Sequence, residues 1–217
     1  MRIVFISDTH LRHTFAVPDG DVLIHCGDGT MTGTAREIDR WAVFLAAQPH
    51  QQKIAIAGNH DILFETNRRK AQAHFEKSGA IYLQDSSIVI EGVKFYGSPH
   101  TPWFNDWAFN VHRGRALSLK WDRVPRDTDV LITHGPPEFM LDLVDGLHVG
   151  SAEMWDMLEV VKPVIHAFGH LHDSHGTQLF KETLFVNAAI LDDSYKIRYE
   201  PVVVDLDPAT KKAIVVE

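Results

Sequence analysis

The chain has 217 residues, of which 45% are hydrophobic and 10% aromatic, and this is enough apolar material for one domain with a large core. Its 21 basic and 29 acidic residues give a formal net charge of -8, and no segment gathers five or six Lys and Arg. The composition therefore excludes a disordered chain, and it makes wrapping of long nucleic acid or adhesion to an anionic membrane poor first hypotheses.

Short apolar runs recur along the chain, and each leads directly into polar residues. The first run, 3–6, meets Asp8 at once, and similar runs follow at 22–24, 54–57, 130–133 and 164–168. The residues after the later runs are Gly27-Asp28, Gly58-Asn59-His60-Asp61, His134-Gly135 and Gly169-His170-Leu171-His172. Near-continuous apolar runs of this length predict strands that are buried on both faces.

Helices are predicted between these strands. Thr34 and Glu37 form a capping box, which predicts a helix that ends before Pro49. Two further helices are predicted. One runs over about 65–78 with Gly79 as its stop, and the other lies between 151 and 163 with Met154, Leu158 and Val161 facing inward. Because strands and helices alternate, we predict an α/β fold.

Two hairpins interrupt a purely parallel arrangement. The runs 88–90 and 93–96 flank a two-residue turn, and 202–204 and 214–216 flank a turn at 208–210. The sheets are therefore expected to be mixed. The chain has no internal repeat or Gly/Ser-rich linker, so we predict a single domain over residues 1–217.

The single cysteine, Cys26, forms no intrachain disulfide, which fits a reducing compartment. The amino terminus shows no targeting signal, because its apolar run is too short and meets Asp8. No run approaches the roughly 18 apolar residues that a membrane span requires. We therefore expect a cytoplasmic protein that has no membrane partner.

The polar residues at the strand ends include several metal-ligand types. Asp8 and His10 are two residues apart, as are His170 and His172, and in an extended chain that spacing directs both side chains of a pair to the same side. The remaining candidates, Asp28, Asn59 and His134, each follow a glycine or a strand end. Each candidate alone is more often a capped turn or a satisfied buried histidine.

Together the candidates are two Asp, one Asn and four His, without a thiolate. This set suits Mn, Fe or Zn better than Ca or Cu(I), and seven side chains are too many for one tetrahedral ion. We therefore predict two divalent cations that share one carboxylate, with Mn as the leading metal. Such pairs sit about 3.5–4 Å apart and catalyse displacement at phosphorus with an activated water. With a bridging hydroxide, one positive charge stays uncompensated, which a phosphodiester monoanion would neutralise.

Five groups of polar residues follow the apolar runs: Asp8-Thr9-His10, Gly27-Asp28, Gly58-Asn59-His60-Asp61, His134-Gly135 and Gly169-His170-Leu171-His172. In this order, they resemble the motifs of the calcineurin-like metallophosphoesterases. The resemblance implies a four-layer sandwich in which helices flank two mixed β-sheets. It also implies a ligand set for each metal: Asp8, His10, Asp28 and His172 for one, and Asp28, Asn59, His134 and His170 for the other, with Asp28 bridging. His60 would be the general acid or the charge stabiliser of the transition state, and Asp61 would orient it.

A narrower resemblance covers most of the chain. Segments such as 21–25, 97–99 and 107–110 are similar to small metallophosphoesterase-domain-containing proteins, which are grouped with class III cyclic nucleotide phosphodiesterases. This group implies hydrolysis of small phosphodiesters, including 2',3'-cyclic nucleotides. Protein phosphatases of the superfamily follow Gly-Asp with Asp-Arg-Gly, whereas Gly27-Asp28 continues as Gly29-Thr30-Met31 here.

The segment 99–109 is long and aromatic for a connector. Aromatic faces stack on nucleobases, so Trp103, Phe104 and Trp107 are candidate substrate-binding residues together with His13. The alternative is that the segment packs as a satellite cluster or forms a subunit contact. Of the other histidines near the motifs, His25 and His166 are expected in the core or behind the metal ligands, and His175, like His13, is a candidate for the substrate side.

The sequence thus predicts a dimetal phosphodiesterase whose partner is a small phosphodiester, with nucleotides included, and not a long nucleic acid. The alternatives are a phosphomonoesterase or protein phosphatase, an oligonucleotide nuclease, and a non-catalytic scaffold of the same fold. The sequence leaves the oligomeric state open.

Overall fold

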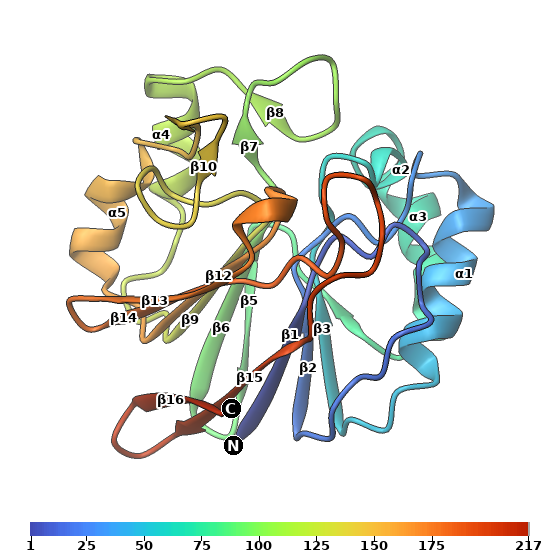
Figure 1. Cartoon of the computed structure of the whole chain (residues 1–217), viewed down its shortest axis with the longest axis horizontal. Coiled ribbons are helices and arrows are strands. Elements are labelled where there is room, and N and C mark those ends of the chain that lie inside the picture. The colour runs from blue at the N-terminus through green and yellow to red at the C-terminus, as the bar shows by residue number, and fades with distance from the viewer. Residues whose placement is uncertain (217) are drawn as a thin grey trace.

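A computed structural model describes residues 1–216, and in it two six-stranded sheets stack against each other between two groups of helices (Figure 1). The first sheet consists of β1 (Arg2–Ile6), β2 (Val22–His25), β3 (Gln52–Ala55), β4 (Ile81–Tyr82), β15 (Val202–Asp207) and β16 (Lys212–Val216). Its strand order is β16-β15-β1-β2-β3-β4. The strands β1 to β4 are parallel, and the hairpin of β15 and β16 adds the antiparallel part.

The second sheet has the same mixed character. It consists of β5 (Ser86–Ile90), β6 (Val93–Ser98), β9 (Val130–Thr133), β12 (Ile165–Phe168), β13 (Gly176–Phe180) and β14 (Thr183–Asn187). In the order β13-β14-β12-β9-β6-β5, the four central strands are parallel and each edge strand is antiparallel to its neighbour. Both sheets are mixed, as the two hairpins predicted.

Helices cover the outer faces of both sheets. On the first sheet lie α1 (Ala35–Ala46), α2 (Ile62–Thr66), α3 (Arg68–Phe75) and the short 3-10 helix η1 (Glu76–Ser78). On the second lie α4 (Arg115–Trp121) and α5 (Met154–Val161). The remaining elements are the 3-10 helix η2 (His172–Ser174) and the short strand pairs β7 (Thr101–Pro102) with β8 (Asn110–Val111) and β10 (Leu143–Val144) with β11 (Leu147–His148).

The alternation of side chains in β1 shows why four layers form. Ile3 and Phe5 belong to the apolar cluster between the sheets, whereas Val4 and Ile6 belong to the cluster under the helices. Since successive residues of a strand point to opposite faces, a strand that is apolar at every position must be covered on both sides. The predicted sandwich of two mixed sheets flanked by helices is confirmed.

Two of the predicted helices match the structure and one does not. The capping box of Thr34 and Glu37 starts α1, and α5 ends before Pro163 as expected. The continuous helix predicted over 65–78 is wrong, because the chain breaks at Asn67, where φ is −152° and the side chain accepts a hydrogen bond from the backbone N–H of Lys70. The stop signal at Gly79 indicates where the helical segment ends, and it could not reveal a cap inside the segment. The helix α4 was not predicted.

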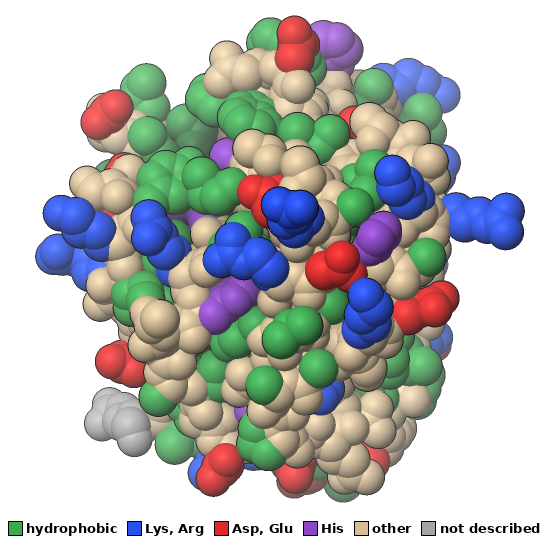
Figure 2. All heavy atoms as spheres, turned by 90° about the vertical axis from the view of Figure 1, so that its right-hand side faces the viewer, with side chains coloured by type: hydrophobic (Ala, Val, Ile, Leu, Met, Phe, Trp, Pro, Cys, Tyr) green, Lys and Arg blue, Asp and Glu red, His purple; other side chains and the backbone are tan. Residues whose placement is uncertain are grey.

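The outer face of α1 carries charged side chains. Figure 2 shows this side of the molecule, where Lys and Arg side chains lie among acidic and apolar ones. The opposite face of α1 is buried through Ile38, Trp41 and Leu45. Within residues 1–216, none of the helices combines the length and apolar character needed to cross a bilayer.

The parallel strands of both sheets end at the same side of the molecule, where the longest loops gather (Figure 1). Just beyond β1, Ser7 forms an isolated bridge with Ala189, which follows β14, so the two sheets touch through backbone at this edge. This edge holds the predicted site.

Candidate metal centre

All seven predicted metal ligands lie in the loops that follow parallel strands. Asp8 and His10 follow β1, Asp28 follows β2, Asn59 follows β3, His134 follows β9, and His170 and His172 follow β12. The first sheet thus contributes four of these residues and the second sheet contributes three. Because the two sheets stack, residues up to 164 positions apart in sequence come together at one edge.

The route by which these residues converge differs from the extended chain that the spacing suggested. Asp8, His10, Asp28 and His170 all have positive φ, at 53°, 40°, 54° and 68°. A left-handed backbone is unfavourable for residues other than glycine, so it persists only where the surrounding structure enforces it. Such residues are concentrated at functional sites. Sharp turns, not extended segments, direct these side chains inward.

Three groups of side chains could each hold a cation. Asp8, His10 and His172 form one, Asp28, His134 and His170 form a second, and His10, Asp28 and His60 form a third, with the potential ligand atoms of each group within 4.8 Å of one another. The first two groups follow the two ligand sets that the resemblance implies. Asp28 belongs to the second and third groups.

The position of the Asp28 carboxylate suits a bridging ligand. Its Oδ2 lies 3.8 Å from Nε2 of His10 and 3.3 Å from Nε2 of His134, so it stands between one histidine of each predicted set. The amide of Asn59 joins the second set, because its Oδ1 lies 2.9 Å from Nε2 of His134. All of these residues except His170 are buried.

The tautomers of the histidines also fit a metal. Nδ1 of His10 lies 2.9 Å from the carbonyl of Thr30, Nδ1 of His134 lies 3.0 Å from that of Cys26, and Nδ1 of His172 lies 3.0 Å from that of Asp192. A neutral imidazole that donates from Nδ1 has its lone pair on Nε2, the arrangement that metal-binding histidines adopt. In each case the carbonyl therefore fixes Nε2 as the ligating atom.

Two of the buried candidate ligand atoms have unsatisfied hydrogen-bonding capacity. Asp8 Oδ1 and His10 Nε2 have no hydrogen-bond partner among the described residues. A buried polar group without a partner costs free energy, and a carboxylate costs more than a neutral group. A divalent cation between these atoms would satisfy both, so the residues present fit the predicted metal.

Charge coupling within the site follows from the same burial. Burial opposes ionisation of Asp8 and Asp28, but the nearby imidazoles outweigh it and lower the pKa of both carboxyl groups. Nε2 of His172 lies 3.5 Å from Asp8 Oδ1, and Nε2 of His134 lies 3.3 Å from Asp28 Oδ2. Burial also disfavours charge on His134 and His172, yet these carboxylates raise the pKa of each histidine to about 9. A bound cation would replace those imidazole protons as the partner of the carboxylates.

His60 lies at the margin of the metal centre. Its backbone N–H donates to Asp28 Oδ1 over 2.8 Å, and its Nδ1 lies 2.7 Å from the carbonyl of Met31. The ring meets that of His10 edge-on at 4.7 Å and stacks on Trp107 at 4.1 Å. The Nδ1–H donor is thereby occupied, and Nε2 is the atom of His60 that remains for a substrate.

The expectation that Asp61 orients His60 is wrong. The Asp61 carboxylate instead accepts hydrogen bonds from the N–H of Gly58 at 2.8 Å and from the N–H and hydroxyl of Thr30 at 3.0 and 2.6 Å. Burial and the charge of Asp28 raise its pKa to about 6. Asp61 therefore ties together the loops after β2 and β3, and the carbonyl of Met31 takes the orienting role.

The predicted substrate-binding residues divide into two groups. Trp107 contacts His60, and Trp103 and Phe104 line a cavity of about 350 Å³ that His170 also lines. His13 instead stacks on Phe44 of α1, with ring centroids 4.0 Å apart. The structure thus places Trp107 against His60, places Trp103 and Phe104 in a cavity beside His170, and packs His13 against a helix.

The other histidines near the motifs have packing roles. His25 Nε2 lies 3.0 Å from the hydroxyl of Thr9, and His166 Nε2 lies 2.8 Å from that of Thr133. Both hydroxyl residues are next to a predicted ligand in sequence, so each buried histidine holds a ligand loop. His175 stacks on Tyr199 at 4.6 Å.

One residue at the site was missed. The ring of Tyr195 lies 4.9 Å from that of His10 and 5.2 Å from that of His172, in a turn where its φ is 58°. It stands in a segment without a motif and 23 residues after the last predicted ligand, so no local pattern indicated it.

Comparison with known proteins gives one consistent answer. Residues 1–174 match the family model described as calcineurin-like phosphoesterase. Metallophosphoesterase domain-containing protein 1 of Homo sapiens is 37% identical over 230 residues, covering 94% of this chain and 71% of the human protein. A UPF0046 protein of Caenorhabditis elegans is 37% identical, and the alignment covers 95% of this chain and 81% of the nematode protein.

The fold is shared more widely than the sequence. The solved structure of TT1561 of Thermus thermophilus has a TM-score of 0.62 at 14% identity and covers 99% of this chain and 97% of its own. From the family match, the close relatives and the clustered aspartates and histidines, it follows that this chain belongs to the calcineurin-like phosphoesterases, a family of metal-dependent phosphoesterases with dinuclear centres.

Proposed function

We propose that the protein is a phosphodiesterase that hydrolyses small phosphodiesters at two divalent cations, with Mn as the preferred metal. The single observation that carries the proposal is the Asp28 carboxylate, whose Oδ2 lies between Nε2 of His10 and Nε2 of His134. When bound, the cations would supply a water of lowered pKa and stabilise charge on the phosphoryl oxygens. The remaining chemistry falls to the side chains around them.

Asp8, His10, Asp28 and His172 would hold one cation, and Asp28, Asn59, His134 and His170 would hold the other. Two divalent cations against the carboxylates of Asp8 and Asp28 leave an excess of positive charge that attracts an anionic ester. Because the carbonyls of Thr30, Cys26 and Asp192 fix three of the imidazole rings, the donor atoms need little rearrangement.

His60 would act on the leaving oxygen of the ester. Its Nδ1–H is committed to the Met31 carbonyl, so Nε2 is the atom that would carry and donate a proton to that oxygen, or stabilise its charge. Trp107, stacked on the ring, would restrict its rotation. These contacts support catalysis by His60 in the role that the sequence predicts.

The preference for diesters rests on the lack of a free guanidinium at the position where phosphatases carry one. Gly29 follows Asp28 and has no side chain. The hydroxyl of the next residue, Thr30, donates to Asp61. A dianionic monoester would therefore lack the cationic clamp that a monoanionic diester does not need.

The test is a comparison of substrates with Mn(II) supplied: bis(p-nitrophenyl) phosphate, p-nitrophenyl phosphate, and 2',3'-cyclic and 3',5'-cyclic nucleotides. We expect a higher kcat/KM for the diesters than for the monoester, and 2',3'-cyclic nucleotides are the nucleotide candidates that the sequence suggests. Preference for p-nitrophenyl phosphate would refute the diesterase assignment. Replacing Mn(II) by Zn(II) or Fe(II) tests the choice of metal.

A further inference from the structure

A cavity of about 350 Å³ adjoins the metal centre on the side of His170. One wall is the loop that joins β7 to β8, with Trp103 and Phe104, and the other is the β10–β11 hairpin with Val144. His170, a predicted ligand, lines both the cavity and the metal centre. A molecule whose phosphate lies at the cations could therefore place one of its ester groups in this cavity.

The lining of the cavity is mainly apolar. Besides Trp103, Phe104 and Val144, it includes Val149 and Leu171. Among the described residues that line it, Arg113 is the one with a permanent charge. Two of its five N–H groups are used, because Nη1 donates to the carbonyl of Gly150 at 2.9 Å and Nη2 to that of Val149 at 2.7 Å. The cavity therefore offers contact area and few free hydrogen-bonding groups.

The rim of the cavity continues this character outward. Trp103 is 51% exposed, Phe104 61%, Leu143 52% and Leu147 68%, and all four belong to the same two segments. Exposed apolar side chains that gather around a cavity are typical of a ligand-binding groove or an interaction site. The rim and the cavity together form one apolar surface that leads to the metal centre.

We propose that this cavity binds an apolar alkyl or aryl ester group of the substrate, so that the preferred substrates are amphiphilic phosphodiesters. The proposal rests on the proposed phosphodiesterase function, and it assigns the chemical class of one ester group. Burying each methylene in the cavity strengthens binding, because apolar surface leaves water. A nucleobase fits less well, since its polar edge requires several donors and acceptors and the cavity offers few besides Arg113 and His170.

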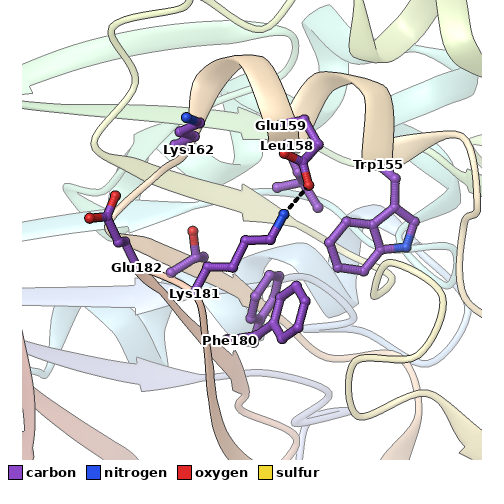
Figure 3. Close-up of a pocket in the computed structure, with 9 residues that line it drawn as sticks. Trp155, Leu158, Glu159, Lys162, Phe180, Lys181 and Glu182 are labelled. Carbon is purple, nitrogen blue, oxygen red and sulfur yellow. Dashed lines mark hydrogen bonds and ion pairs between the residues drawn. The ribbon is translucent and has the colours of Figure 1, made fainter.

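A second hollow with an apolar lining lies apart from the metal centre. It lies between α5 and the β13–β14 hairpin, where Lys181 forms an ion pair with Glu159 across the opening (Figure 3). The ammonium group of Lys181 also lies 5.6 Å from the centroid of the Phe180 ring. None of the described residues that line it belongs to the metal centre. We therefore assign no substrate group to this hollow.

The test measures binding directly, so it does not depend on turnover. The Mn(II)-loaded protein is titrated by calorimetry with methyl, butyl and hexyl phosphate, which resemble the product that retains the apolar group, and with adenosine 5'-monophosphate. We expect the Kd to fall by at least tenfold from methyl to hexyl phosphate. Equal Kd values across the alkyl series, or tighter binding of the nucleotide than of hexyl phosphate, would overturn the proposal.

Variants show whether the dependence of Kd on alkyl chain length arises in the cavity. Val144→Asn places a polar group in the cavity wall, and Val89→Asn makes the same change at an exposed strand position in β5, outside the cavity. We expect Val144→Asn to remove most of the dependence on chain length and Val89→Asn to leave it intact, with unchanged melting temperature and manganese content in both. Phe104→Asn is a second cavity variant. Chain-length dependence that persists in both cavity variants would refute the location.

The two proposals can fail separately. A protein that binds hexyl phosphate tightly but hydrolyses none of the diesters would refute the phosphodiesterase function and leave the apolar site standing. A protein that hydrolyses diesters but binds the alkyl phosphates with equal Kd would refute the apolar site alone.

Discussion

The ring of Trp107 lies on the imidazole of His60, with centroids 4.1 Å apart and an angle of 28° between the planes. Aromatic stacking of this kind contributes about 0.5–1.5 kcal/mol beyond the buried area. Since the Met31 carbonyl fixes only one end of the imidazole, the stacked indole restrains the rest of the ring. This contact gives the aromatic segment a role beside the catalytic candidate.

Trp107→Leu is therefore expected to lower kcat by roughly threefold to tenfold, which corresponds to the stacking energy. Trp107→Phe keeps an aromatic face and should retain activity close to that of the wild type. Steady-state kinetics on bis(p-nitrophenyl) phosphate measure both. If the two variants lose activity equally, stacking on His60 is not the reason for the loss.

His60→Asn tests the proposed proton donor. We expect kcat to fall by on the order of 10²–10⁴, the usual contribution of general acid–base catalysis, while manganese content stays at the wild-type level. Metal analysis of the purified variant accompanies the kinetics. His74→Asn is the matched control, because it makes the same change in α3, where His74 contacts Asp39. It should leave kcat unchanged. Wild-type turnover in His60→Asn would remove this residue from the mechanism.

Gly58→Ala tests the position of Asp28. A Cβ at this position would lie 2.2 Å from Asp28 Oδ1 and 2.6 Å from Cε1 of His134, so both side chains must move. Displacement of catalytic groups by about 1 Å can cost on the order of 10² in rate, and we expect a loss of that size in kcat/KM together with weaker manganese binding.

Gly92→Ala serves as the control for Gly58→Ala. Its φ is +76° with open space around the Cβ, in the β5–β6 turn, so it should lower the melting temperature without changing activity. Equal activity of Gly58→Ala and the wild type would show that the site tolerates the shift.

His166 makes the stability of the fold depend on pH. Burial lowers its pKa from 6.5 to about 3, so the unfolded chain binds one more proton than the folded chain between these values. Its contribution to stability is complete above about pH 6.5 and is lost as the pH falls toward 3. One proton taken up on unfolding gives a slope of about 1.4 kcal/mol per pH unit.

His166→Gln keeps an N–H donor for Thr133 but cannot be protonated in this range. Urea unfolding between pH 6 and 4 should show a slope that is smaller than that of the wild type by about 1.4 kcal/mol per pH unit. His112→Gln, at an exposed position, is the control. The same slope in His166→Gln as in the wild type would contradict a neutral buried imidazole.

The sequence was sufficient to predict those parts of the structure in which a local pattern and the overall fold agree. Runs such as 130–132 are apolar at every position because they lie between two layers, and the parallel strands must bring their following residues to one edge. Hence the strands, the mixed sheets and the gathering of residues such as Asp8 and His134 could be predicted. The family resemblance added the division into two ligand sets.

What could not be predicted depends on residues that are distant in sequence. Asp61 and His60 are neighbours, yet Thr30 and Met31 determine where each side chain forms its hydrogen bonds. Tyr195 reaches the site through a turn that carries no motif. The left-handed backbone at Asp8 and His10 likewise could not be predicted, because most Asp and His residues have negative φ.

The division of the predicted metal ligands between the two sheets has a mechanical consequence. Asp28 follows a strand of one sheet and His134 follows a strand of the other. Their contact lies over a seam that apolar packing, the bridge of Ser7 with Ala189, and hydrogen bonds such as that from the His170 N–H to Asp8 Oδ2 also hold. A cation shared by these two side chains would cross-link the halves of the sandwich, much as a disulfide joins distant segments. Sliding of one sheet over the other would then require release of the ion, so chelation should accelerate amide exchange along this seam before it affects the outer helices.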